Sequence, residues 1–282
     1  MKRVLLTGAG GFVGTRVMRQ LADRLDLVPA PRGLMAKGRE GDITRLVQET
    51  RPDVILHTAA LSDTGYCEVH PEESRRANIE VTLWLAKAAA GEGARLVAFS
   101  SDQVYAGVTL HGPLSEDLPL APSNVYGRHK LEMEQRVLDI LPDAVLLRAT
   151  WLYDLPGYGL PIKGNLPLNL LHAALYGESL TFSPGDYRGV TYVRQAVENL
   201  LPVLELPGGA YNFGSENDLD MLETAWQFCA ALQISPDLVP GDRARNLSMN
   251  TAKAQKGGVS FDTTVEGISR CLRDYDMTWW KK

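Results

Sequence analysis

Cysteine is scarce in this chain of 282 residues, which contains only three. Cys67, Cys229 and Cys271 stand far apart and show neither C-x-x-C nor metal-ligand spacing. This pattern predicts neither a disulfide framework nor a metal site, and isolated thiols in odd number are typical of a reducing compartment. We therefore expect a cytoplasmic protein that holds no metal.

Long apolar runs are also lacking, because no segment approaches the length that spans a bilayer. The amino terminus passes from Val4-Leu5-Leu6 directly into a glycine turn, which is too short for the apolar region of a signal peptide. We expect no membrane as a partner.

An excess of positive charge is the third absence, since 29 Lys and Arg against 34 Asp and Glu give a formal net charge of -5. This balance provides no basic field for nucleic acid, which we do not expect as a partner. Composition leaves the oligomeric state open between a monomer and a homodimer. The end Met277-Thr278-Trp279-Trp280 predicts either a packed terminus or an exposed contact patch.

Short apolar runs alternate with amphipathic stretches through the first half of the chain. The alternation is typical of parallel strands joined by crossover helices, and it predicts an α/β fold of Rossmann type, with a doubly wound parallel sheet and a smaller C-terminal substrate-binding lobe. The expected strands are Arg3–Thr7, Leu27–Ala30, Val54–His57, Leu96–Ser101 and Val145–Arg148. The expected helices are Phe12–Arg24, Ile43–Thr50, Glu73–Ala90 and Val125–Ile140.

The sequence pattern changes from Trp151 onward, where frequent proline and glycine interrupt any long helix or strand. We expect residues 1–150 to form the Rossmann domain, with later segments contributing, and residues 151–282 to form mainly the substrate-binding lobe. Later elements are expected as one strand, Ala210–Phe213, and as helices at Leu166–Tyr176, Arg194–Leu204, Leu219–Leu232 and Thr264–Asp274.

A glycine-rich turn, T-G-A-G-G-F-V-G, ends the first expected strand and opens the first helix. Gly8 permits the tight turn, Gly11 lets the backbone approach a diphosphate at the positive helix end, and Gly14 allows close helix packing. With the backbone of Phe12 and Val13, the turn predicts a dinucleotide site. The alternative is a glycine turn without a ligand.

The end of the second expected strand carries Pro31 and Arg32 where an acidic residue would bind a ribose. No carboxylate is there to accept a 2′-hydroxyl, whereas an arginine can pair with a 2′-phosphate. We therefore expect NADPH as the cofactor, with NADH as the alternative. Arg32 is otherwise a solvated surface residue.

Tyr126 and Lys130 lie four residues apart, so both project from one face of a helix. The cation is expected to lower the pKa of the phenol towards the working range of a general acid. Ser101 ends the preceding strand, where it can hydrogen-bond the carbonyl oxygen that Tyr126 protonates. Ser101, Tyr126 and Lys130 together predict hydride transfer. The alternative is that the serine caps a helix and that the other two lie on a helix with surface ion pairs. We interpret His57 and His129 as structural, because neither fits a serine-aspartate arrangement.

The order of these motifs resembles the dTDP-4-dehydrorhamnose reductase family of extended short-chain dehydrogenase/reductases, over nearly the whole chain. The likeness runs through G-x-x-G-x-x-G, Arg51-Pro52-Asp53, Ser100-Ser101-Asp102-x-Val104-Tyr105, Tyr126-Gly127-x-x-Lys130, Arg148-x-x-Trp151 and Asp186-Tyr187-Arg188-Gly189. It implies that Ser101, Tyr126 and Lys130 carry catalysis. Further implied cofactor contacts are Asp42 against the adenine ring, with Ile43 after it, Ala59 and Ala60 beside the nicotinamide ribose, and Asn78. Asp42 is equally a good helix N-cap.

The resemblance implies a nucleotide-linked 4-keto-6-deoxysugar as the substrate. We expect the amino end of the helix at Asn165 and the charge of two arginines to hold its diphosphate. The alternative for each residue is a structural role: Trp151 would belong to the core, Asn165 would cap the helix, and both arginines would be solvated. Ser101, Gln103, Val190 and Leu247 depart from the usual residues of the family and leave the exact sugar open. The expected substrate contacts are Asp102, Gln103, Trp151, Asn165, Arg188 and Arg243.

Related proteins of this superfamily perform other tasks. Sugar-nucleotide dehydratases use a glutamate base where Gln103 offers an amide, and epimerase-reductases use a cysteine that is missing beside Ser101. Another nucleotide-sugar epimerase is an alternative. So is a binding module that resembles the regulatory subunit of methionine adenosyltransferase. The presence of Ser101, Tyr126 and Lys130 together favours an enzyme.

Overall fold

The computed structural model describes residues 1–277, so the Trp279-Trp280 end lies outside the described residues. Six parallel strands form the central sheet in the order β10-β5-β4-β3-β1-β2. Each strand predicted in the first half is present, with its ends within one residue of the expected bounds. The predicted Rossmann-type sheet is therefore confirmed. Its strands are β1 Arg3–Thr7, β2 Asp26–Pro29, β3 Val54–His57, β4 Arg95–Ser101, β5 Val145–Ala149 and β10 Gly209–Phe213.

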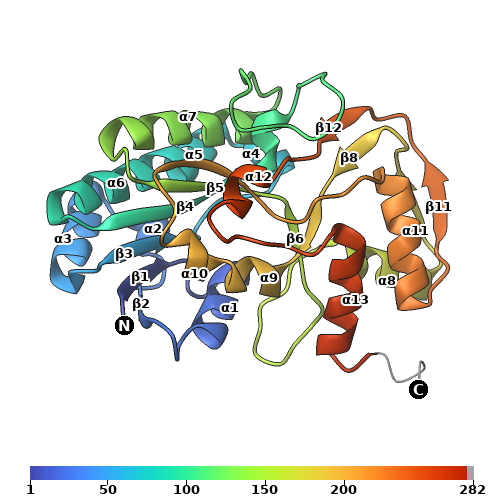
Figure 1. The fold of residues 1–282 in the computed structure, drawn as a ribbon, viewed down its shortest axis with the longest axis horizontal. Helices are drawn as coiled ribbons and strands as arrows, with labels where there is room; N and C mark the ends of the chain where they lie inside the picture. The colour runs from blue at the N-terminus through green and yellow to red at the C-terminus, as the bar shows by residue number, and fades with distance from the viewer. Residues whose placement is uncertain (278–282) are drawn as a thin grey trace.

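Helices cover both faces of this sheet (Figure 1). Val4 and Leu6 face one side and Leu5 the other, and all three are fully buried, as expected for strands of a parallel sheet covered on both faces. The side with Val4 packs against α1 Phe12–Gln20, α9 Val193–Glu198 and α10 Leu200–Val203. The side with Leu5 packs against α3 Glu40–Thr50, α6 Val81–Glu92 and α7 Val125–Ile140.

The helix predicted over Glu73–Ala90 begins earlier and is divided. It consists of α5 Pro71–Arg75, a π-helical turn η1 Arg76–Glu80 and then α6. Proline at the first helical position, with its fixed φ, explains the early start. Inside the π turn, the amide of Asn78 accepts a hydrogen bond from the Leu61 N–H and donates one to the Leu61 carbonyl. The turn therefore fixes the segment that follows β3.

The second half of the chain is shared between two parts of the molecule. It adds β10 to the free edge of β5 and packs α9 and α10 against the central sheet, and its other elements form a smaller lobe. The lobe has a separate apolar core that includes Leu166, Leu170, Phe228 and Ile268. Its helices are α8 Leu166–Tyr176, α11 Met221–Leu232 and α13 Thr264–Asp274. Its strands form the parallel pairs β6 Trp151–Tyr153 with β9 Val190–Tyr192, β7 Ser179–Phe182 with β11 Asp237–Pro240, and β8 Asp186–Arg188 with β12 Arg245–Leu247. Short helices elsewhere are α2 Leu34–Lys37, α4 Thr64–Val69, η2 Asp102–Tyr105 and α12 Ala252–Gln255.

The strand order determines where a ligand can enter. β2 and β3 lie on opposite sides of β1, so the direction of sheet building reverses between them. In open parallel sheets, ligands bind in the crevice at the carboxyl ends of the strands beside such a switch point. The ends of β1 and β3 therefore locate the candidate site.

The described residues contain no helix that is both long and apolar enough to cross a lipid bilayer. Within the same 1–277 range, no three His, Cys, Asp or Glu side chains gather as a metal site.

Candidate active site

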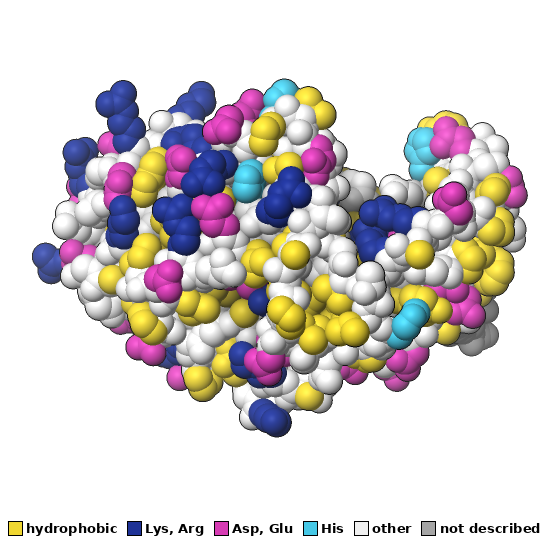
Figure 2. All heavy atoms as spheres, turned by 90° about the horizontal axis from the view of Figure 1, so that it is seen from above, with side chains coloured by type: hydrophobic (Ala, Val, Ile, Leu, Met, Phe, Trp, Pro, Cys, Tyr) yellow, Lys and Arg dark blue, Asp and Glu magenta, His cyan; other side chains and the backbone are white. Residues whose placement is uncertain are grey.

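A cavity of about 1100 Å³ opens at the carboxyl ends of the central strands. Gly8 after β1, Thr58 after β3, Ser101 at the end of β4 and Thr150 after β5 all line it. Figure 2 shows a hollow between the two lobes in which Lys and Arg side chains gather. The volume exceeds the roughly 300 to 1,000 Å³ of most small-molecule sites, so it can admit a dinucleotide and a second ligand together.

Two glycines of the turn, Gly8 and Gly14, have no room for a side chain. A Cβ on Gly8 would stand 2.7 Å from the Ala59 nitrogen, and Gly8 has a φ of +70°, which favours glycine. A Cβ on Gly14 would stand 2.1 Å from the Gly8 carbonyl oxygen. Gly11 provides no side-chain cap for α1, and the first turn of α1 has no acidic residue. The free N–H groups and positive end of α1 therefore suit an anion such as a diphosphate.

The predicted cofactor residues divide into two groups. Those that line the cavity are Gly8, Gly11, Phe12, Val13, Ala59, Ala60, Tyr126 and Lys130. The others are absent from its described lining. Arg32 is exposed before α2. Asp42 is also exposed and accepts the backbone N–H of Arg39. Because α3 begins earlier than expected, Arg39 is its N-cap and Asp42 is its third residue, so the expectation that Asp42 is the N-cap is wrong. Ile43 is buried in the core, and Asn78 acts on the backbone of Leu61.

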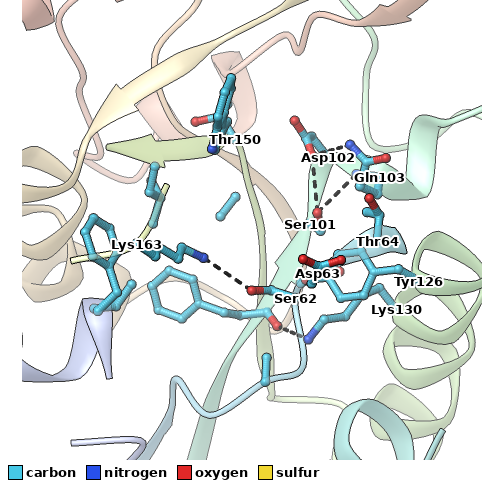
Figure 3. A pocket seen from close by; sticks show the side chains of 18 of the residues that line it. Ser62, Asp63, Thr64, Ser101, Asp102, Gln103, Tyr126, Lys130, Thr150 and Lys163 are labelled. Atoms are coloured by element: carbon cyan, nitrogen blue, oxygen red, sulfur yellow. Dashed lines mark hydrogen bonds between the residues drawn. The ribbon is translucent and has the colours of Figure 1, made fainter. Parts of the chain in front are cut away.

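Ser101, Tyr126 and Lys130 meet on the cavity wall (Figure 3). Tyr126 and Lys130 lie on α7, and Ser101 ends β4. Helix α7 packs closely against η2, and this packing brings the three side chains together. Gly127 permits it, since a Cβ there would stand 2.2 Å from the Gln103 carbonyl oxygen. We call these three residues, which are the candidates for catalysis, the catalytic floor.

Burial controls the protonation of the catalytic floor. It lowers the pKa of Lys130 to about 8, which Glu134 opposes, and the Lys130 Nζ donates to the Phe99 carbonyl at 2.8 Å. Burial also raises the pKa of Tyr126, and the Ser101 side chain opposes that rise. The expectation that the pKa of the phenol is lowered is therefore wrong for this structure, because desolvation of the phenolate and the charge of Asp102 outweigh the hydrogen bond of Ser101.

Asp102 links the catalytic floor to the second lobe. The carboxylate is 1% exposed, accepts the Ser101 hydroxyl at 3.2 Å and forms an ion pair with Arg188 in which Nη2 and Oδ2 are 2.5 Å apart. The Arg188 guanidinium also lies 5.5 Å from the centre of the Trp151 ring. Arg188 therefore has a carboxylate partner already, which differs from the expectation of a cation awaiting a diphosphate.

The other predicted substrate residues differ in whether their polar groups already have a partner in the protein. Arg243 lines the cavity and has no carboxylate partner within the described residues, whereas its neighbour Arg245 pairs with Asp186 at 2.5 Å. Gln103 lines the cavity and donates its amide to Asp102. Asn165 is fully buried, caps α8 through the Leu168 N–H and donates to two backbone carbonyls. Its amide serves the chain itself, which is the capping alternative.

The model of the family described as the RmlD substrate binding domain matches residues 1–272. The chain belongs to this family. A dTDP-4-dehydrorhamnose reductase of Burkholderia thailandensis is 29% identical over 245 residues, which cover 85% of this chain and 80% of that protein. The methionine adenosyltransferase 2 subunit beta of Xenopus laevis is 34% identical over 160 residues, 54% of this chain and 47% of that protein.

Solved structures agree on the fold of this RmlD-family chain. The dTDP-4-dehydrorhamnose reductase of Bacillus anthracis in complex with NADP has a TM-score of 0.86 at 22% identity, and the match covers 97% of this chain and 99% of that one. The family predicted from the sequence motifs is confirmed.

Sequence reasoning missed two groups in this RmlD-family site. Glu134 lies one helical turn after Lys130, accepts from Ser100 and forms a buried ion pair with Arg148, in which Nη2 and Oε2 are 2.8 Å apart. The four-residue spacing from Lys130 could have indicated it. Lys163 reaches the cavity from an irregular segment of the second lobe, and nothing in the sequence marked it for this position.

Proposed function

We propose that this protein is an NADPH-dependent reductase of a nucleotide-linked 4-keto-6-deoxysugar. dTDP-4-dehydrorhamnose is our first candidate, since relatives named for its reduction match this chain. The observation that carries the proposal is the convergence of the catalytic floor and the glycine turn on one cavity. A nicotinamide cofactor, when bound, supplies the hydride.

Tyr126 is the proton donor in this proposal. Because burial raises the pKa of its phenol, Tyr126 is protonated at neutral pH and can give its proton to the carbonyl oxygen as the carbonyl carbon accepts the hydride. The Ser101 hydroxyl holds the same oxygen. The Lys130 ammonium, 5.7 Å from the centre of the Tyr126 ring, stabilises the phenolate that remains until it is reprotonated.

The glycine turn and α1 fit the diphosphate of a dinucleotide. Gly8 and Gly14 keep the backbone clear of side chains, and the uncapped end of α1 presents N–H groups. Arg32, exposed beyond β2, would give the preference for the 2′-phosphate of NADPH over NADH. We also propose that Asp42, with Ile43 after it, lies at the adenine end of the cofactor. Asn78, which holds the segment after β3, would act at the nicotinamide end.

Residues 151–282 would hold the sugar nucleotide against the catalytic floor. Trp151 provides an apolar surface for the sugar, and Arg243 provides a cation that no described carboxylate neutralises. The Asp102–Arg188 pair would orient Ser101 and bound the pocket beside Gln103.

An assay with purified protein tests the proposal. NADPH oxidation is followed with dTDP-4-dehydrorhamnose and with a small unphosphorylated ketone, and thermal unfolding is followed with each nucleotide, because a ligand of the native state raises its apparent stability. We expect NADPH to stabilise the protein and the sugar nucleotide to be reduced. Binding of NADPH with no reduction of any keto-sugar nucleotide, together with a stable protein partner, would favour the binding-module alternative.

A further inference from the structure

Lys163 lies over the amino end of the cofactor helix α1. It belongs to the segment 154–165, which joins β6 to α8 and which we call the strap. Its Nζ is 3.3 Å from the Ser62 Oγ in the segment after β3 (Figure 3). The same Nζ is 5.8 Å from the centre of the Phe12 ring. Phe12 is the first residue of α1. The ammonium therefore lies beside the amino end of α1 in the same cavity that Gly8 and Gly11 of the glycine turn line.

This ammonium has no carboxylate partner in the described part of the chain. The side chain of Lys163 is open to solvent, but the protein around it desolvates the ammonium in part and lowers its pKa, which Asp63 opposes. The remaining cations that line the cavity lie elsewhere: Lys130 on α7, and Arg188, Arg243 and Arg245 on the second lobe. Of the cations in the described lining, Lys163 is the one that lies against α1, over the ring of Phe12.

The strap is fastened to the same helix that it covers. Arg16 of α1 is 1% exposed, and its Nε lies 2.5 Å from the Asp154 Oδ2 at the start of the strap. Its Nη1 donates to the Pro161 carbonyl, two residues before Lys163, and to the Phe12 carbonyl. Tyr275 donates to Asp154 from the C-terminal end. One buried guanidinium therefore holds the start of the strap and its Pro161 segment against the first turn of α1.

We propose that Lys163 binds the diphosphate of the dinucleotide from above, opposite the N–H groups of α1. The proposal rests on the proposed function, because it requires a dinucleotide in the cavity. A lysine acts here as a point charge, and the Ser62 hydroxyl holds it over the helix end until a phosphate oxygen replaces that contact. Arg16 and Asp154 are positioning residues, since they act through the strap and touch no ligand.

The diphosphate is common to NADPH and NADH, and this makes the test specific. Lys163→Met should weaken both cofactors by the same factor, roughly tenfold, as for one charge-assisted contact near the surface. Lys163→Arg should keep most of the affinity. Lys256→Met, the same change at an exposed lysine that follows α12 and is absent from the described cavity lining, should leave both dissociation constants unchanged. Isothermal titration of each variant with each cofactor measures the constants without catalysis.

A second variant tests the positioning role. Asp154→Asn removes the charge that holds Arg16 and should weaken cofactor binding several-fold, as well as lower the thermal unfolding temperature. Added to Lys163→Met, it should cause little further loss of affinity, because both changes act through one contact. A purely structural role for Asp154 would give additive losses.

The outcomes separate two failures. Unchanged cofactor affinity in Lys163→Met, or a loss confined to the sugar nucleotide, overturns this inference and leaves the reductase proposal standing. Failure of the unmodified protein to bind either NADPH or NADH overturns the proposed function and this inference with it. Lys163 is exposed, so its substitution should leave the fold intact, which thermal unfolding checks.

Discussion

The catalytic floor and the rim of the same cavity treat their charges in opposite ways. On the floor, Lys130 is buried and its ammonium donates to a backbone carbonyl, while Asp102 beside Ser101 is neutralised by Arg188. We call Lys163 and Arg243 the rim. Both line the cavity, and neither has a carboxylate partner among the described residues. The floor is complete without a ligand, whereas the rim provides charges that a ligand would neutralise.

This difference indicates that the floor serves the chemical step and the rim serves ligand binding. A prearranged floor costs little reorganisation when charge develops on a carbonyl oxygen, which is how polar sites accelerate reactions. Unpaired cations on the rim gain most when phosphate groups arrive, so they contribute to binding. Changes on the floor should therefore lower turnover, and changes on the rim should lower affinity.

The largest expected effect is on the floor. Tyr126→Phe keeps the ring and removes the proton, so it should lower kcat by roughly two to four orders of magnitude with cofactor affinity little changed. Steady-state kinetics and NADPH titration of the same preparation measure both quantities. Near-normal turnover would remove Tyr126 from the mechanism and would break the comparison at its strongest point.

Arg188→Ala and Arg243→Ala form a matched pair across the boundary between floor and rim. Loss of Arg188 leaves the Asp102 carboxylate buried and unpaired beside Ser101, and its charge would raise the pKa of Tyr126 further, so kcat should fall roughly tenfold to a hundredfold. Arg188→Lys should recover part of this loss. Arg243→Ala should raise KM for the sugar nucleotide roughly tenfold with kcat nearly unchanged. Equal kinetic signatures in the two variants would show that the boundary is misplaced.

The pH dependence of kcat sharpens the same comparison. The pKa of Lys130 is lowered to about 8, so the ammonium is charged below that pH and neutral above it. If turnover needs the charge, kcat should be level below pH 8 and fall about tenfold per unit above it. Lys163→Met should leave this profile unmoved. A profile that stays level well above pH 8 would show that the charge of Lys130 is dispensable.

The smallest expected effect is at an exposed cation. Arg32→Ala should weaken NADPH by about tenfold or less, because a solvated contact is at the low end for charge-assisted bonds, and should leave NADH unchanged. The ratio of the two dissociation constants is the measurement. Equal losses for both cofactors would identify Arg32 as a surface charge without a role in cofactor choice.

Sequence periodicity and spacing predicted the sheet and the catalytic floor because both depend on local signals. Helix α7 has the expected bounds, and the four-residue spacing places Tyr126 and Lys130 together. The ion pair beside the floor and the position of the rim lysine depend instead on contacts between segments far apart in the chain. The pairing of Arg188 with Asp102, 86 residues away, and the reach of Lys163 to Ser62, 101 residues away, have no local signature. The pKa of Tyr126 also depends on desolvation, which a sequence does not display.

Transfer of a labelled hydride tests the central claim most directly. NADPH deuterated at the transferred position is mixed with dTDP-4-dehydrorhamnose and the protein, and the sugar product is analysed by mass spectrometry and NMR. The account predicts one deuterium at C4 of the reduced sugar with the unmodified protein, and a rate lower by orders of magnitude with Tyr126→Phe. Unlabelled product, or no reduction of any nucleotide-linked 4-keto-6-deoxysugar by protein that binds NADPH, would contradict it.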